Sequence, residues 1–550
     1  PVNCDVKATV VSGINAQVTN NGAQHLTEVS KRAFDEKYLQ MGMVTTESEV
    51  AIAVSTVHDV FLDGEKTEET AYKIVDDRRK IHAKIQLDIP KGETARVEKI
   101  STVHSSRDLE YTGSGKEPDK ETVYANGLEN LKEAECKGYR TLLQESREVW
   151  EAIWKKQDIV IDSREDDAQV AVRFALYHLQ IMVRKEDNRV GIGAKALSGE
   201  GYKGHSFWDT ETFIFPYFQM AEPEVARTLL EFRYKGLYGA RKKANENGYK
   251  GAMYPWESSD KGNEDNTVTN IYGPFENHIT GDVAMATWQY YSVVQDLEWL
   301  RQKGFPIISA AADYWVSRSE PNEAGEYEIR NVIGADEWNQ NPQGGKNVNN
   351  NAYTNGVAKS TLEAACKAAK LLNMKSDPMW ATVAGKLRFR QQANGVTAEH
   401  DTYDGAITKQ ADVCLLAFPL KLVTDKEQIR KDLEYYLQTV PRKKTPAMSK
   451  SIYSILFTRL GDRERAWHYF RDSYCPNLNP PFRVIAEFDS GTNPYFLTGA
   501  GGVLQSVLMG FGGLDITDKG IVAGKGTLPD AWKSITLKGI GKEKKNYTIK

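Results

Sequence analysis

Cysteine is scarce in this 550-residue chain, which has five, without a CxxC pair or another metal-ligand spacing. A sparse, odd set of this kind is typical of buried apolar side chains and argues against a disulfide framework. The compartment stays open, and we expect a soluble protein that is either cytoplasmic or exported with its leader removed. No stretch approaches the roughly 18 consecutive apolar residues of a transmembrane helix, so no membrane span is expected.

An excess of positive charge is also missing. The chain has 71 basic and 75 acidic residues, a formal charge of −4 and a pI of about 6.2. Nucleic acid is therefore not an expected partner, because its binding sites leave a strongly basic footprint. The glycines at 499, 501 and 502 lack the following lysine of a phosphate-binding loop, and they favour close helix packing or a tight turn. Aromatic residues are plentiful, with 11 Trp and 26 Tyr, and favour a protein that binds a ring.

The start of the chain lacks an initiating methionine, a basic segment and an apolar leader. Strand-like alternation already begins at about residue 7, so we expect that the chain starts inside a longer polypeptide.

Four regions follow from the sequence pattern. Residues 1–120 alternate as strands and predict an antiparallel β-sandwich, here expected to be truncated. Residues 121–166 predict linker helices, and 167–511 predict about ten helices joined by long loops. Residues 512–550 return to short strands and predict a small C-terminal β domain. Paired helices without heptads or a short repeat favour a toroid of helix hairpins.

Aromatic residues stand beside carboxylates in two of the long loops. Phe207, Trp208 and Asp209 lie in GYKGHSFWDTETF, and Trp256 and Glu257 lie in GAMYPWES. Aromatic faces stack on a sugar ring and carboxylates accept its hydroxyl protons, so the loops favour a carbohydrate site. The plainer alternative is that Asp209 or the next residue caps a helix while the aromatics fill a core.

Two later loops carry the remaining carboxylates. Asp336 and Glu337 precede Trp338, and a carboxyl buried near an indole has the raised pKa that a general acid needs. The tract 349–355 is interpreted as a loop into a helix, with its last Asn near the cap. Glu487 stands between Ala and Phe, an unusual place for a solvated carboxylate. Two carboxylates on opposite faces of a sugar are the minimum for glycoside hydrolysis.

The motifs together resemble glycoside hydrolase family 65, which includes disaccharide phosphorylases and a hydrolytic branch. GYKGHSFWDTETF, GAMYPWES, VIGADEW with NNNAYTN, and KQADV follow in the family's order over roughly residues 165–515. The resemblance implies a multidomain, mainly α fold: an (α/α)6 barrel with an N-terminal β-sandwich and a small C-terminal β domain.

The resemblance also implies roles for individual residues. Glu337 matches the general acid, and Glu487 matches the general base of the hydrolytic branch. The substrate-binding set comprises the wall of the glucosyl subsite, pocket-lining aromatics and polar residues: Phe207, Trp208, Asp209, Trp256, Glu257, Asp336, Trp338, Lys409 and Gln410.

One segment departs from the phosphorylase pattern. Phosphorylases of the family carry a histidine and hydroxyl residues for phosphate, where this chain has Lys444, Pro446 and Ala447. The hydroxyl cradle is largely absent, so a hydrolase is favoured over a phosphorylase.

The sequence thus predicts an inverting exo-α-glucosidase for α-1,2-linked glucose, from glucosyl-galactosyl-hydroxylysine or kojibiose. Its partner is a small carbohydrate or glycopeptide, and neither a metal nor a cofactor is expected, because proton transfer carries the reaction. The oligomeric state stays open. The alternatives are an inverting disaccharide phosphorylase and a non-catalytic carbohydrate-binding protein.

Overall fold

The computed structural model describes most of the chain, namely residues 1–20, 22–67, 71–114, 118–163, 167–196, 199, 201–266, 272–338, 347–492 and 495–550. The chain divides into two compact units, Pro1–Trp154 and Lys155–Lys550, here called the N-terminal and C-terminal units. They are described one after the other. The finer boundaries expected at 120, 166 and 511 stay predictions.

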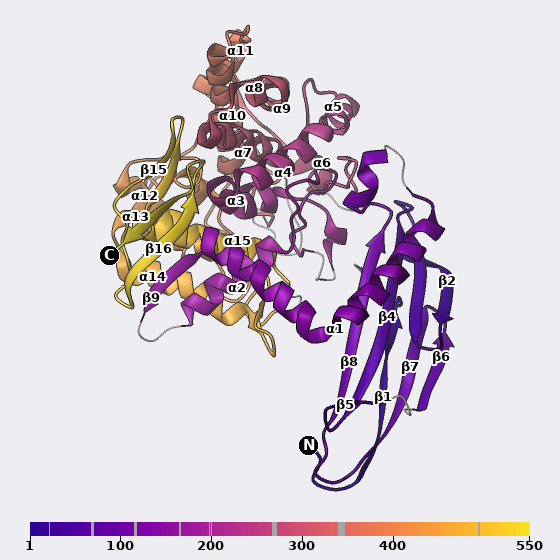
Figure 1. Cartoon of the computed structure of the whole chain (residues 1–550). Helices are drawn as coiled ribbons and strands as arrows, with labels where there is room; N and C mark the ends of the chain where they lie inside the picture. Colours follow the sequence, from indigo (N-terminus) through magenta and orange to yellow (C-terminus); the bar gives the residue numbers. More distant parts are fainter. Residues whose placement is uncertain are drawn as a thin grey trace. The chain divides into compact units, whose positions relative to one another are not determined.

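The N-terminal unit is built from two antiparallel sheets (Figure 1). One sheet has the order β1-β7-β6, and the other has the order β2-β3-β4-β5 with β8 also paired to β4. The strands are β1 (Val6–Asn15), β2 (Leu26–Phe34), β3 (Tyr38–Thr45), β4 (Ala51–Leu62), β5 (Glu65–Lys66), β6 (Ala71–Asp77), β7 (Lys80–Ile89) and β8 (Ala95–Ser105). The antiparallel sandwich predicted for this region is confirmed.

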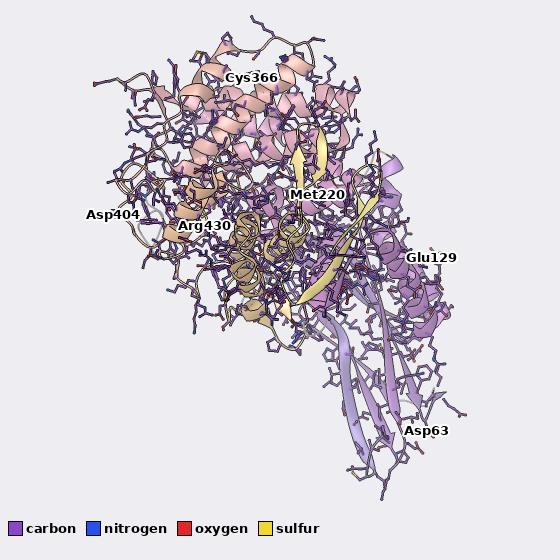
Figure 2. All side chains as sticks on the ribbon, turned by 90° about the vertical axis from the view of Figure 1, so that its left-hand side faces the viewer. Asp63, Glu129, Met220, Cys366, Asp404 and Arg430 are labelled. Carbon is purple, nitrogen blue, oxygen red and sulfur yellow. The ribbon has the colours of Figure 1, made fainter. Side chains whose placement is uncertain are left out.

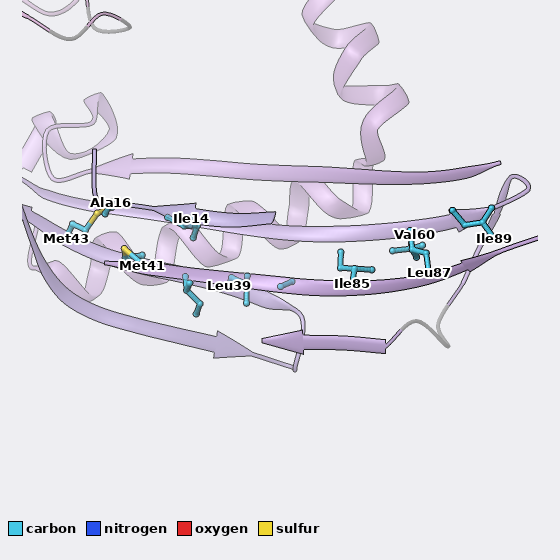
Figure 3. Close-up of a cluster of buried hydrophobic side chains, with 11 residues drawn as sticks. Ile14, Ala16, Leu39, Met41, Met43, Val60, Ile85, Leu87 and Ile89 are labelled. Atoms are coloured by element: carbon cyan, nitrogen blue, oxygen red, sulfur yellow. The ribbon is translucent and has the colours of Figure 1, made fainter. Parts of the chain in front are cut away.

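The apolar core of this unit lies between the sheets (Figure 3). Alternate residues of β3 and β7 enter it, among them Leu39 and Met41 of β3 and Ile85 and Leu87 of β7. The period of two places the intervening residues on the opposite faces of the sheets. At the far end of β4, Asp63 and Gly64 both have positive φ and form the two-residue turn into β5. Figure 2 labels Asp63 at the end of the strands.

The other face of β3 and β4 is covered by the long helix α1 (Lys120–Lys156). Val123 and Tyr124 of this helix pack against Ala51 and Ala53 of β4. Gly42 of β3 allows this close approach, because a Cβ there would lie 2.5 Å from the Tyr124 ring. The sheet that contains β3 and β4 is therefore covered on both faces, by the other sheet and by α1. Within α1 the backbone leaves the helical conformation at residue 138, so the predicted linker helix is broken in two.

The C-terminal unit is mostly helical (Figure 1). Its α-helices are α2 (Ala168–Gln180), α3 (Phe215–Ala221), α4 (Pro223–Lys235), α5 (Leu237–Glu246), α6 (Tyr272–Phe275), α7 (Ile279–Val294), α8 (Leu297–Trp299), α9 (Phe305–Arg318), α10 (Ala352–Leu371), α11 (Pro378–Lys386), α12 (Lys426–Tyr436), α13 (Ala447–Leu460), α14 (Arg463–Asp472) and α15 (Leu497–Gln505). Short 3-10 or π turns are η1 (Leu109–Ser114, in the N-terminal unit), η2 (Tyr202–Gly204), η3 (Thr210–Ile214), η4 (Leu300–Gly304), η5 (Val413–Leu416), η6 (Cys475–Asn477) and η7 (Ser506–Phe511). None of the helices in the described part of the chain has both the length and the apolar character of a transmembrane segment.

Packing contacts connect these helices in sequence. One series runs from η3 and α3 to α7, α10, η5, α13 and α15, and α15 packs back against η3 and α3. A second set packs on the first: α2 on α15, α4 on α3 and α7, α9 on α7 and α10, α11 on α10, α12 on η5 and α13, and α14 on α13. The loops that carry the predicted site residues connect these helices.

Short strands complete the C-terminal unit. They are β9 (Ile159–Ser163), β10 (Glu320–Pro321), β11 (Tyr327–Glu328), β12 (Leu478–Asn479), β13 (Val484–Ile485), β14 (Leu514–Thr517), β15 (Gly520–Ala523), β16 (Trp532–Ile540) and β17 (Lys545–Ile549). β16 pairs with β17 on one side and with β9 on the other. The last strands of the chain thus share a sheet with a strand from the region predicted as linker.

Candidate active site

The first loop places Asp209 at the start of the π-helical turn η3. Trp208 and Asp209 are buried, and Oδ1 of Asp209 accepts a hydrogen bond of 2.5 Å from the hydroxyl of Thr498 on α15. Asp209 makes no helix-capping hydrogen bond and the hydroxyl of Thr210 donates to the carbonyl of Ile192, so the predicted cap is not formed, although Phe207 and Trp208 are buried. Burial raises the pKa of Asp209 to about 6 against the opposing Thr498 hydrogen bond, and the charges of Glu487 and Glu337 add to the rise.

An aromatic cluster surrounds a buried histidine that the sequence interpretation missed. The ring of His278 lies edge-on to Trp208, Trp256 and Tyr353, with centroids 4.8, 5.4 and 5.2 Å away. Phe207 in turn meets Trp256 edge-on at 5.7 Å. The predicted aromatics from the first two loops are thus in one wall, with His278 behind it. Its only sequence signal is a lone histidine at the start of an apolar helix.

Carboxylates hold the ring of His278 from both sides. Nδ1 lies 2.8 Å from Asp282 and Nε2 lies 3.3 Å from Glu276, and Asp282 also accepts 2.6 Å from the hydroxyl of Tyr353. Burial alone would lower the pKa of His278, but Asp282 and Glu276 raise it to about 10. The two carboxylates therefore favour the charged form of His278 and fix its ring within the aromatic cluster.

Glu257 takes part in a polar cluster of its own loop. Its carboxylate lies 3.0 Å from Nδ1 of His205, and the backbone amide of Glu257 donates to Glu264 at 2.9 Å. Glu264 also accepts from the amide of Trp256 at 2.8 Å and pairs with Lys243 at 2.5 Å. The loop that carries Trp256 is thus fixed by Glu264, which the sequence pattern did not single out.

The third loop contains a buried carboxyl with the raised pKa that its sequence suggested. Asp336 is fully buried, and Oδ1 accepts 2.7 Å from the amide of Lys409 and 3.2 Å from that of Trp338. Burial raises the pKa of Asp336 to about 7, against the Lys409 hydrogen bond and helped by the charge of Asp412. Burial likewise raises the pKa of Glu399, which shares the site with Asp336. Asp336 therefore fixes the backbone at Lys409 and at Trp338.

Glu337 reaches a different partner. Its Oε2 forms an ion pair of 2.8 Å with Nζ of Lys409, and its side chain is about one-fifth exposed. Burial would lower the pKa of Lys409, but the charges of Glu337 and Glu487 raise it above the ordinary value. Gln410 follows in the same loop and donates to the carbonyl of Ala335. The third loop and the KQADV segment are thus joined, as their shared place in the predicted site required.

Glu487 is buried and held at both its backbone and its side chain. Oε2 accepts 2.9 Å from Nζ of Lys195 and 3.1 Å from the hydroxyl of Tyr202. The backbone carbonyl of Glu487 accepts from the amide of Ala447, the first residue of α13, and from Nδ2 of Asn477. The expectation that Glu487 is not a solvated carboxylate is confirmed. Lys195 and Tyr202 were not predicted as site residues, although Tyr202 lies within the GYKGHSFWDTETF motif and Lys195 lies a few residues before it.

The two predicted catalytic carboxylates, Glu337 and Glu487, raise the pKa of the same neighbouring groups. The charges of Glu487 and Glu337 both raise the pKa of Tyr202, where burial is the largest cause, and both raise that of Asp209. Both also act on Lys409. Residues 150 positions apart are therefore brought to one group of side chains.

The segment that differs from phosphorylases lies next to Glu487. Ala447 donates its amide to the Glu487 carbonyl at 2.9 Å, and Ser449 accepts 3.1 Å from the amide of Ala411. Pro446 and Ala447 thus occupy the start of α13 beside the proposed base, without side-chain hydroxyls.

A possible metal-ligand group among the described residues is His104, Asp108 and Glu110 in the N-terminal unit. It is partly exposed, includes none of the residues above, and does not affect the prediction that the reaction uses no metal.

Models of two domains match the chain. The central catalytic domain of glycosyl hydrolase family 65 matches residues 173–405 and 391–479, and the family's N-terminal domain matches 1–153. The chain belongs to glycosyl hydrolase family 65. The predicted family is thereby confirmed, including the sandwich region and the mostly helical catalytic region.

Individual family 65 relatives are also similar. A kojibiose hydrolase from Mucilaginibacter mallensis is 50% identical over 417 residues, 76% of this chain and 60% of that protein. A protein-glucosylgalactosylhydroxylysine glucosidase from Gallus gallus is 40% identical over 338 residues, 60% of this chain and 47% of that protein. The chain thus matches less than two thirds of the length of either. A candidate kojibiose phosphorylase from the human microbiome shares the fold, with a TM-score of 0.76 at 20% identity over 98% of this chain and 73% of that one.

Proposed function

We propose that the protein is an inverting exo-α-glucosidase that hydrolyses α-1,2-linked glucose, with Glu337 as general acid and Glu487 as general base. The observation that carries this proposal is the buried Glu487, held on one oxygen by Lys195 and Tyr202. Water is a weaker nucleophile than phosphate and needs such a base. The similarity to a kojibiose hydrolase supports the same linkage.

The catalytic region is proposed to be an (α/α)6 barrel. The series η3–α3, α7, α10, η5, α13 and α15 closes on itself, and α2, α4, α9, α11, α12 and α14 pack on it. Six inner members with one outer partner each are what this barrel requires. In such a barrel, loops far apart in sequence converge at one end of the axis. This would explain how the loops of Asp209, Glu337 and Glu487 share one group of neighbours.

In the proposed reaction, Trp208 and Trp256 form the wall of the glucosyl subsite, and Asp209 accepts hydrogen bonds from sugar hydroxyls. Glu337 protonates the glycosidic oxygen as the bond to the anomeric carbon breaks. Glu487 takes a proton from the water that attacks the opposite face, so the product has inverted configuration. Lys409 pairs with Glu337. We propose that Lys409 donates to a sugar hydroxyl instead when substrate binds, which favours the protonated form of the acid.

The test is glucose release from kojibiose in phosphate-free buffer and in buffer with phosphate. Hydrolysis gives two glucose molecules at the same rate in both, with β-glucose appearing first by NMR. The alternative is a phosphorylase, which the anion-attracting Lys444 and the phosphorylase-like fold favour. Strict dependence on phosphate, with glucose 1-phosphate as product, would establish that alternative.

The leaving group is tested in parallel. Kojibiose and glucosyl-galactosyl-hydroxylysine present the same α-1,2 glucosyl unit on different acceptors, and the two relatives are named for these two substrates. We propose kojibiose as the better substrate because the identity to the kojibiose hydrolase is higher. A higher kcat/KM on the glycopeptide unit would assign the chain to the other substrate. Binding without turnover on both would make it a carbohydrate-binding protein.

A further inference from the structure

We infer that Lys195 is a positioning residue for hydrolysis, which holds Oε2 of Glu487 in an ion pair and thereby presents the other carboxylate oxygen to the attacking water. This inference rests on the proposed function. The side chain of Lys195 is completely buried, and its Nζ lies 2.9 Å from Oε2 of Glu487. A buried lysine is costly unless it is paired, so the pair is a built feature of the site.

The lysine is fixed from several directions. Its ammonium lies over the rings of Phe496 and Tyr202, 4.7 and 5.3 Å from their centroids. The backbone before it is anchored to α15, since the carbonyl of Ala194 accepts from the amide of Leu497 at 2.9 Å. The position of Nζ is therefore set by packing and not by a mobile side chain.

Both donors to Glu487 use the same oxygen. Lys195 and the hydroxyl of Tyr202 donate to Oε2, and within the described part of the chain no hydrogen bond reaches Oε1. The backbone carbonyl of Glu487 is fixed by Ala447 and Asn477. Oε1 is therefore the oxygen available to accept the proton of water, and the Oε2 clamp fixes its direction.

Other titratable groups also lie near Glu487. They are the phenol of Tyr202, the carboxyl of Asp209 and the ammonium of Lys409, which itself pairs with Glu337. The ammonium of Lys409 already pairs with Glu337, the proposed acid. A charge on Asp209 would disfavour a negative charge on Glu487 nearby. Lys195 is thus the cation bonded to the base, and its removal should make Glu487 easier to protonate.

The test is Lys195→Met in the full chain, with kojibiose as substrate. We expect kcat to fall roughly 10- to 100-fold with KM changed less than about threefold, a smaller loss than removal of a general base. The acid limb of the kcat/KM profile should move to higher pH by about 1 to 3 units, as expected when a cation beside a carboxylate is removed. Tyr202→Phe removes the second donor and should shift the limb in the same direction by less.

The matched control is Lys450→Met. Lys450 is also a buried lysine, paired with Asp472 at 3.3 Å, and is not assigned to the site. It should lower the melting temperature while leaving the acid limb in place. If Lys195→Met does not fold, the Tyr202→Phe profile decides.

Two outcomes would overturn the inference: an active wild type whose Lys195→Met profile keeps its acid limb, or an equal shift in Lys450→Met. A wild type without hydrolysis would instead overturn the proposed function itself, so the two failures are distinguishable.

Discussion

Each of the two proposed catalytic carboxylates is bonded to a lysine, yet the two need opposite protonation states. Glu337 pairs with Lys409, which is itself proposed to contact the sugar, whereas Glu487 pairs with Lys195, whose ammonium lies over aromatic rings. Substrate can redirect the first lysine, but the second is fixed by its packing. The same type of pair thus serves a proton donor in one case and a proton acceptor in the other.

The two roles are separated by a substrate that needs no acid. Fluoride leaves without protonation, so Glu337→Gln should lose about 10³-fold on kojibiose but far less on α-glucosyl fluoride. Glu487→Gln should lose a similar factor on both substrates, because each requires activated water. Initial rates on the two substrates check this. Equal losses of Glu337→Gln on both, or retention of fluoride hydrolysis by Glu487→Gln, would contradict the assignment.

The buried carboxyl of Asp209 lowers the stability of the folded protein at neutral pH, although it is proposed to bind the substrate. Burial raises its pKa from 3.8 to about 6, so the folded protein holds a proton that the unfolded chain releases. The stabilising effect of that proton is complete below about pH 4 and is lost as the pH rises through 6. The loss is about 3 kcal/mol at most.

Asp209→Asn removes this titration and keeps an oxygen for the Thr498 hydroxyl. As the pH rises from 4.5 to 7.5, the melting temperature of the wild type should therefore fall relative to that of the variant. The variant should not hydrolyse kojibiose. Thermal unfolding at the two pH values measures the difference. A melting-temperature difference that does not change with pH would be inconsistent with a buried carboxyl at this position.

Among the elements, α15 packs unusually close to η3, the turn that follows Asp209. A Cβ on Gly501 would lie 2.5 Å from the backbone oxygen of Phe213, so the predicted role of this glycine in close helix packing is confirmed. The same helix carries Thr498, the hydrogen-bond donor to Asp209. The spacing of these two elements therefore positions a substrate-binding residue.

Gly501→Ala should push α15 away from η3, at a cost of about 1–3 kcal/mol. We expect a lower melting temperature and a higher KM for kojibiose, because Asp209 loses its fixed orientation. The control is Gly385→Ala on α11, where a Cβ would meet nothing within 4 Å. That variant should keep both values. Unchanged KM in a folded Gly501→Ala would argue against this coupling.

Much of the element order and of the site was readable from the sequence because the site lies on loops with unusual residue pairs. The features that the sequence did not predict, such as helix boundaries, depend on contacts in the folded chain. The apolar periodicity predicts single helices over 223–244 and 279–302, but the first is divided at residue 236 and the second is interrupted at Gln295, which has a left-handed backbone. The periodicity also predicts a helix that starts at 359, but α10 begins at Ala352, because the side chain of Asn351, and not Asn355, accepts the capping hydrogen bond.

The missed site residues share one property. Lys195 gains its role from Glu487, which is distant in sequence, and His278, although bonded to the nearby Glu276 and Asp282, joins the site by packing on Trp208 and Trp256 of other loops. A lone histidine in an apolar stretch is usually a core residue, and periodicity cannot place a carboxylate behind it. Aromatic–carboxylate pairs adjacent in sequence were therefore found, whereas residues that join the site through packing between distant segments were not.

At the scale of the whole molecule, all the proposed site residues belong to the C-terminal unit, Lys155–Lys550, and none to Pro1–Trp154. The N-terminal unit has its own core between two sheets. A unit with its own core can unfold as a separate cooperative transition. A ligand of the glucosyl subsite would then stabilise one transition only.

Calorimetry of the full chain should therefore show two unfolding transitions, with enthalpies of roughly 110 kcal/mol for the 154-residue unit and roughly 280 kcal/mol for the larger one. A basic glucose analogue at 100 times its Kd should stabilise the larger transition by about 2.7 kcal/mol and leave the smaller one in place. Glu487→Gln should weaken this shift, because the analogue's cation would lose a carboxylate partner, whereas Lys450→Met should not. A single transition that moves as a whole would show instead that the two units unfold together.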